Sequence, residues 1–180
     1  MAKVRRAKAY SKRKPVINSR KSKQKKFSYV KSIPEQKIKK LNMGDVKGYE
    51  EKKYGIKASL ITLEDIQIRD MALEAARQTI HKDMVTSFQN NYFLKCHPFP
   101  HNILRNNRVF SGGSKGERIQ TGMSKSFGSS EGRAATVRKN NVIFSAYFNG
   151  QENIHKVREF LKKAAPKLPC KTRINFEFLK

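Results

Sequence analysis

Apolar and polar positions over residues 32–180 alternate or cluster in ways that predict a series of short strands. The run VIFSAYF at 142–148 is apolar enough for the centre of a sheet, whereas TRINFEF at 172–178 alternates as a half-buried strand does. Strands are predicted at residues 36–42, 54–61, 92–97, 133–138, 142–148 and 172–178. A glycine-containing loop is expected at 43–53, and residues 139–141 (KNN) have the length of a tight hairpin turn.

Two segments have a helical spacing of apolar residues. The first helix is expected to open at Thr62 or Glu64 and to end near His81 and Lys82 in a solvated last turn. Its buried stripe is predicted to combine two neighbouring rows, namely Ile68, Ala72, Ala75 and Thr79 with Leu73, Ala76, Ile80 and Met84.

The second helix is predicted to be capped by Asn149, with Glu152 three residues later, and to be ended by Pro166. Its buried stripe is Ile154, Val157, Leu161 and Ala164. Its other face carries Lys156, Arg158, Lys162 and Lys163, which suits either contact with phosphates or an ordinary solvated surface. Taken together, these elements predict a single α+β domain over residues 32–180, with two helices against a mainly antiparallel sheet.

The segment at residues 111–132 differs in composition from the rest of the chain. It holds six glycines and six serines, with Ile119, Met123 and Phe127 as its bulky apolar side chains. We expect one long loop, or two loops around a short helical turn, and loops of that length in a compact domain are usually functional. Lys115, Arg118 and Lys125 would give such a loop the composition of a finger inserted into folded RNA.

The net charge of the chain indicates what kind of partner it binds. The chain of 180 residues has 40 Lys and Arg against 14 Asp and Glu, a formal charge of +26, so its partner is expected to be a polyanion.

Residues 1–31 contain 13 Lys and Arg, no acid and no apolar period, which predicts a basic arm that becomes ordered on phosphates. The arm's phosphate contacts are assigned to Arg5, Arg6, Arg13, Lys14, Arg20, Lys21, Lys25 and Lys26. Tyr10, Phe27 and Tyr29 could stack on bases. A transit peptide, a solvated tail and a nuclear-localisation run remain alternatives for this segment.

Motifs for catalysis and metal binding do not stand out. Gly112–Gly116 could bring backbone amides to an anion, but the sequence has neither G-x-x-x-x-G-K-[ST] nor G-x-G-x-x-G between a strand and a helix. No G-x-S-x-G motif is present, and the four histidines lack metal-ligand spacing. Cys96 and Cys170 suit two thiols in a reducing compartment better than a disulfide or a zinc site. We therefore expect a non-enzyme with no cofactor, no metal and no small-molecule substrate.

Membrane association is not expected either. No stretch approaches the roughly 18 apolar residues that span a bilayer, and the N-terminus lacks the apolar region of a signal peptide.

Several short motifs occur in the same order as in a known family. They are Ser32–Ile38 before Met43-Gly44, Ala72–Arg77, His97–Phe99, Leu104-Arg105, Glu117–Met123, Phe127-Gly128 and Ala164–Pro169. With these motifs the sequence resembles the large-subunit ribosomal protein sixteen family, in its archaeal and eukaryotic ten-e branch. The resemblance implies a hammerhead-type α+β fold in a cytoplasmic ribosome, bound to large-subunit ribosomal RNA and to neighbouring ribosomal proteins. It also implies a structural role, because the peptide-bond chemistry belongs to RNA.

The resemblance further implies that the loop approaches the peptidyl-transferase centre and the peptidyl-site tRNA, and that the protein joins late in subunit assembly. The tRNA-proximal residues would be Gly112, Gly113, Ser114, Lys115, Gly116, Glu117, Arg118, Gln120, Thr121 and Gly122. Further ribosomal RNA contacts are expected at Arg105, Arg108, Lys125 and Arg133. A free RNA- or DNA-binding protein, such as a chromatin compactor, and an RNA-modifying enzyme are the alternatives.

Overall fold

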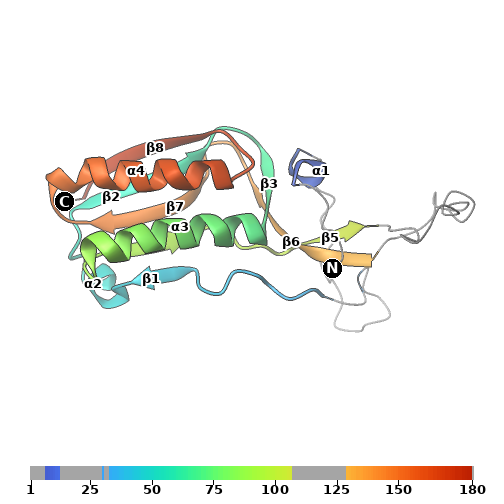
Figure 1. Ribbon diagram of the computed structural model, residues 1–180, viewed down its shortest axis with the longest axis horizontal. Coiled ribbons are helices and arrows are strands. Elements are labelled where there is room, and N and C mark those ends of the chain that lie inside the picture. The colour runs from blue at the N-terminus through green and yellow to red at the C-terminus, as the bar shows by residue number, and fades with distance from the viewer. Residues whose placement is uncertain (1–6, 13–29, 31–32, 107–128, 180) are drawn as a thin grey trace, which may run out of the picture.

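The computed structural model describes residues 7–12, 30, 33–106 and 129–179 (Figure 1). The helices are α1 (Lys8–Ser11), α2 (Val46–Glu50), α3 (Asp70–Phe88) and α4 (Ile154–Ala164), with 3-10 turns at η4 (Gln151–Asn153) and η5 (Ala165–Lys167). The strands are β1 (Asn42–Gly44), β2 (Ile56–Thr62), β3 (Ile66–Arg69), β4 (Phe93–Cys96), β5 (Asn102–Asn106), β6 (Ser129–Val137), β7 (Val142–Phe148) and β8 (Thr172–Phe178). The predicted α+β class is confirmed.

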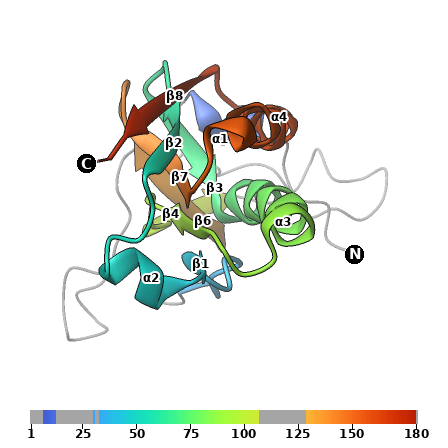
Figure 2. The same ribbon diagram turned by 90° about the vertical axis from the view of Figure 1, so that its left-hand side faces the viewer.

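A five-stranded antiparallel sheet in the order β1-β4-β7-β2-β8 forms the main layer. Leu60 of β2 lies opposite Phe144 of β7 and Ile174 of β8. Helices α3 and α4 cover one face of this sheet (Figure 2), as the two-helix prediction required. The main core lies between the helices and the sheet, and includes Leu60, Leu73, Ile80, Met84, Leu94, Phe144, Phe148 and Leu161, each essentially inaccessible to solvent. Burial of each such side chain contributes about 1.5–3 kcal/mol.

A second, three-stranded antiparallel sheet has the order β3-β6-β5. The predicted hairpin at residues 139–141 is therefore wrong, because β6 belongs to this small sheet and β7 belongs to the large one. Asn140 adopts a positive φ of 67°, and its amide donates to the carbonyl of Thr62 at 2.8 Å. The Thr62 amide in turn donates to the carbonyl of Asn141 at 3.1 Å, so the turn extends the β2 ladder.

Helix α3 begins later than the sequence predicts. Strand β3 occupies residues that the pattern assigned to the helix, because Ile66 and Ile68 alternate as a strand does and are buried in the core. The carboxylate of Asp70 accepts the Met71 amide at 2.8 Å at the true helix start. The row Leu73, Ala76, Ile80 and Met84 is buried as predicted, whereas Ala75 of the other row is exposed.

The stripe on α4 is confirmed at Val157, Leu161 and Ala164, which are buried, and at Ile154, which packs partly buried against the core. The predicted cap is wrong: the Asn149 side chain accepts the Gly55 amide at 2.8 Å and thereby joins the start of β2.

Three further differences concern short segments. The strand predicted at 36–42 is wrong, because residues 36–41 form no strand and β1 occupies 42–44, mostly inside the predicted loop. The loop predicted at 43–53 also contains helix α2, capped by Asp45, whose carboxylate accepts the Gly48 amide at 3.0 Å. The loop predicted at 111–132 is too long at its C-terminal end, since β6 already begins at Ser129.

Candidate nucleic-acid interface

The small sheet lies at one end of the molecule, and two of the predicted RNA-binding arginines are on it. Arg105 is on β5 and Arg133 is on the neighbouring β6, where Arg133 lies opposite Ile103. Both side chains are half-buried, and Arg133 Nε donates to the carbonyl of Pro34 at 2.7 Å. The structure therefore places these two predicted residues on neighbouring strands, where Arg105 lies opposite Ser130.

The other predicted site residues lie outside the described part of the chain. They are Arg5, Arg6, Arg13, Lys14, Arg20, Lys21, Lys25, Lys26, Arg108 and Lys125, together with the proposed tRNA-proximal residues at 112–118 and 120–122.

The segment at residues 107–128 is bounded by paired strand ends. Asn106, the last residue of β5, lies opposite Ser129, the first residue of β6. The ladder shifts register next to Arg105, which faces Ser130, while Leu104 faces Gly132, so that Glu131 is the extra residue of a bulge. Bulges bend and twist a strand pair and often lie beside functional sites.

Helix α1 lies against this end of the small sheet. The Tyr10 hydroxyl donates to the Glu131 Oε2 atom at 2.7 Å and lies 3.3 Å from the carbonyl oxygen of Arg105. The Tyr10 ring packs with Leu104 and Ala134 in a small apolar cluster and is 4% exposed. The expectation that Tyr10 stacks on bases is therefore wrong, because its ring is enclosed by protein.

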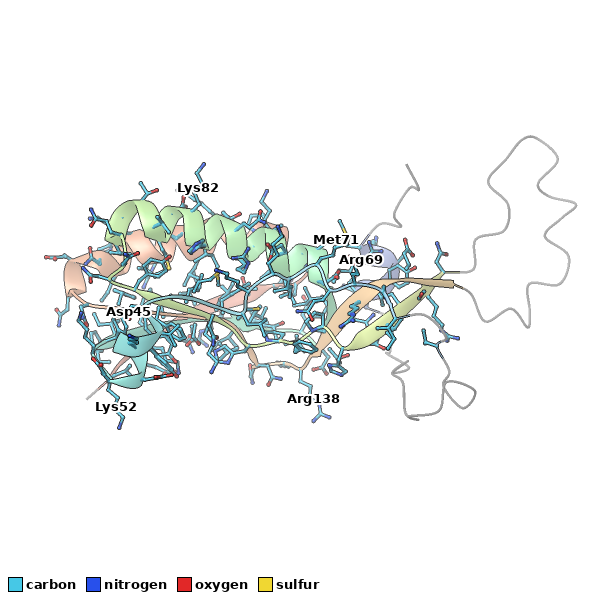
Figure 3. The ribbon with its side chains drawn as sticks, turned by 90° about the horizontal axis from the view of Figure 1, so that it is seen from below. Asp45, Lys52, Arg69, Met71, Lys82 and Arg138 are labelled. Carbon is cyan, nitrogen blue, oxygen red and sulfur yellow. The ribbon has the colours of Figure 1, made fainter. Side chains whose placement is uncertain are left out.

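An arginine covers the same tyrosine. The Arg69 guanidinium carbon lies 4.7 Å from the centroid of the Tyr10 ring, a cation–π distance. Figure 3 shows Arg69 beside helix α1, at the end of the molecule where β5 and β6 run. The Gln67 side-chain amide donates to the Tyr10 carbonyl at 3.3 Å and accepts from Asn102. Backbone and side chain of Tyr10 are thus both fixed to the small sheet.

Sequence reasoning missed this set of contacts. Tyr10, Gln67 and Glu131 are separated by 57 or more positions, and no local period connects them. The alternation of Ile66 and Ile68 would have indicated a strand and so placed Arg69 on a sheet.

Catalytic or metal chemistry has no support in the described ranges. No group of three His, Cys, Asp or Glu side chains gathers there as a metal site, and both cysteines are free thiols. Burial raises the pKa of the Cys96 thiol to about 12, so it is not a nucleophile at neutral pH. Among the described residues, none of the helices has the length and apolarity to cross a membrane.

Arg69, Arg105 and Arg133 lie on the strands of the small sheet, where the Tyr10 side chain anchors helix α1. In a chain with a formal charge of +26, this arrangement is typical of structural RNA-associated proteins. Residues 17–175 match the family described as ribosomal protein L16p/L10e. The chain is 37% identical over 155 residues to large ribosomal subunit protein uL16 of Staphylothermus marinus, covering 84% of each chain. The uL16 proteins of Pyrobaculum islandicum and Halorubrum lacusprofundi are 39% and 32% identical over 150 residues, with 83% and 82% of this chain and 81% and 84% of theirs covered.

The chain belongs to the L16p/L10e family. It is a structural protein of the large ribosomal subunit and not an enzyme, and it associates with ribosomal RNA and other ribosomal proteins in cytoplasmic ribosomes. The family predicted from the ordered motifs is confirmed.

Proposed function

We propose that this protein binds large-subunit ribosomal RNA near the tRNA sites and the peptidyl-transferase centre, where it supports tRNA positioning and late subunit assembly. In this proposal, residues 1–31 act as an RNA-binding arm on a single domain formed by residues 32–180. The segment at 112–122 approaches tRNA.

The observation that carries the proposal is the attachment of both segments at the small sheet. Tyr10 fixes the arm to Glu131 at 2.7 Å, and the pairing of Asn106 with Ser129 fixes both ends of the segment at 107–128. The arm and the loop therefore both adjoin the same pair of strands, β5 and β6. Arg105 and Arg133 lie on the same strands and would add phosphate contacts beside them.

Sedimentation tests the location of the protein. A gentle lysate is run through a sucrose gradient in low and in moderate salt, and the protein is detected by blotting. Stoichiometric migration with the large subunit in both salts is expected. Release from the subunit at moderate salt would contradict a protein embedded in RNA.

The arm and the loop are tested separately in the full chain. Neutralising Arg13, Lys14, Arg20 and Lys21 with glutamine should lower the salt dependence of RNA binding by about 0.7–0.9 for each phosphate that the arm no longer neutralises. Replacing residues 111–122 by a short Gly-Ser linker should leave the melting temperature nearly unchanged while blocking the last step of subunit maturation. An unchanged salt slope in the first variant, or normal maturation with the second, would refute the corresponding role.

A further inference from the structure

A groove separates helix α4 from the edge strand β8. It has a volume of about 340 Å³ and is lined by Arg158, Lys162, Ala165, Thr172 and Ile174. Figures 1 and 2 both show α4 and β8 side by side at the edge of the molecule. Its described lining comes from α4, β8 and Ala165 of η5, and not from the small sheet.

The electrostatics of this groove favour an anion. Among the residues that the structure describes, no acidic side chain lines it. Residues 154–179 contain seven Lys or Arg and two Glu, a formal charge of +5. One of the two acids, Glu177, is already paired with Lys57 at 2.7 Å.

The basic side chains of α4 differ in the contacts that they make with the rest of the protein. Lys163 pairs with Asp83 at 3.1 Å, so its charge is already partly matched. The Arg158 guanidinium carbon lies 5.2 Å from the centroid of the half-buried Phe176 ring, which orients the guanidinium without neutralising it. Lys162, four residues later, is on the same side of the helix.

Helix stability explains only part of this arrangement. Lys162 is in the last turn of α4, where a cation interacts favourably with the helix dipole whether or not a ligand binds. Arg158 is in the middle of the helix and gains nothing from that interaction. Its guanidinium lies over Phe176 and beside a groove that no described acidic side chain lines, which points to an anionic partner.

We propose that the α4–β8 groove binds the phosphate backbone of ribosomal RNA, as a contact separate from the arm and the loop. The proposal rests on the proposed function and adds a second surface to it. A guanidinium fork, an ammonium group and the Thr172 hydroxyl are donor types that proteins use for phosphate oxygens. Ala165 and Ile174 form a small apolar floor that adds no competing acceptor side chain.

The test compares two double variants of the full chain. Arg158→Gln with Lys162→Gln removes two charges from the groove, and Lys47→Gln with Lys82→Gln removes two charges elsewhere. All four side chains are exposed, and Lys82 points away from the body of the molecule in Figure 3. Binding to a transcript of archaeal large-subunit ribosomal RNA is measured between about 50 and 200 mM salt, and polyglutamate is a second probe.

The groove variant is expected to lower the slope of log affinity against log salt by about 1.4–1.8, the value for two neutralised phosphates, with an unchanged melting temperature. The control variant should keep the wild-type slope. Equal slopes in the two variants would overturn the proposal. Loss of polyglutamate binding with RNA binding retained would overturn it as well, and would indicate an acidic protein.

The same binding measurements distinguish an error in the proposed function from an error in the groove proposal. A wild-type chain that does not prefer ribosomal RNA over an unrelated RNA of equal length would refute that function, whatever the two variants do. A normal preference with no effect at the groove would refute the groove alone.

Discussion

The hydroxyl of Tyr10 and the carboxylate of Glu131, 121 positions apart in sequence, are joined by a hydrogen bond of 2.7 Å. Glu131 is the extra residue of the bulge beside Arg105. One side chain thus fixes an N-terminal helix of a single turn to the strand that follows the segment at 107–128.

Tyr10→Phe removes this hydroxyl and keeps the ring. We expect a loss of about 1–2 kcal/mol, because a half-buried carboxylate loses a hydrogen-bond donor. Amide hydrogen exchange should show the loss first in β5 and β6. Tyr54→Phe is the matched control, since the Tyr54 hydroxyl lies 3.5 Å from Asp45 and contributes less. Equal exchange in the two variants would mean that Tyr10 does not hold the small sheet.

Gly44→Ala should be among the most destabilising small substitutions. Gly44 has a φ of +86°, and an added Cβ atom would lie 2.1 Å from the carbonyl oxygen of Tyr92. We expect a loss of more than about 2 kcal/mol in the free energy of unfolding, from backbone strain and displacement of β4. Urea denaturation measures it. Gly132→Ala, where an added Cβ meets no atom of the described residues within 4 Å, should change stability by less than about 0.5 kcal/mol. A loss similar to that of Gly44→Ala would contradict the steric argument.

The ion pair on α3 should show strong coupling. Arg77 Nε donates to Glu74 Oε2 at 2.7 Å, while Arg77 Nη1 contacts the Met43 sulfur at 2.9 Å and so joins α3 to β1. The two side chains retain 9% and 12% exposure, and removing one partner leaves a poorly solvated charge. Glu74→Leu alone should cost about 2 kcal/mol, more than Glu74→Leu with Arg77→Met. Additive losses in a double-mutant cycle would refute the coupling.

Acidification should destabilise the protein through two histidines. Burial is the main cause that lowers the pKa of His81, followed by the positive charges of Arg77 and Lys40. The pKa of His97 is lowered by burial and by Lys95 and Lys57. Because the folded state binds protons more weakly than the unfolded chain, stability is complete above the unfolded pKa of about 6.5 and falls as the pH drops below it.

Melting temperatures between about pH 7.5 and 5 test this expectation, since that window lies above the ordinary titration range of the carboxylates. His81→Gln with His97→Gln should flatten the profile. His81 bonds the Tyr92 hydroxyl at 2.7 Å and is less exposed than His97, so His81→Gln alone should have the larger effect. A profile that stays steep in the double variant would assign the effect to other groups.

Local pattern predicted the fold class because local pattern determines which faces are buried. Strands β7 and β8 have the predicted bounds, and the row from Leu73 to Met84 is buried. The failures come where distant partners decide the outcome. Residues 139–141 look like a hairpin in isolation, but Asn140 bonds Thr62 of a third strand. The side chain of Asn149, which looks like a helix cap, accepts the Gly55 amide instead.

The candidate interface is a prediction from residue type and not from arrangement. Charge and the ordered motifs pointed to Arg105 and Arg133, and the structure places them on the paired strands β5 and β6. The role of Tyr10 could not be predicted, because an isolated tyrosine among lysines suits base stacking as well as a buried anchor. Only the position of Glu131 and Arg69 around it distinguishes the two.

The position of β2 has a consequence for how this chain is made. Strand β2 lies between β7 and β8, so its two neighbours are residues 142–148 and 172–178, near the C-terminus. During synthesis β2 emerges before either of its partners, and the main sheet cannot close until residues 172–178 have been translated. Contacts of this sequence separation form slowly, and the exposed strands are prone to aggregate meanwhile.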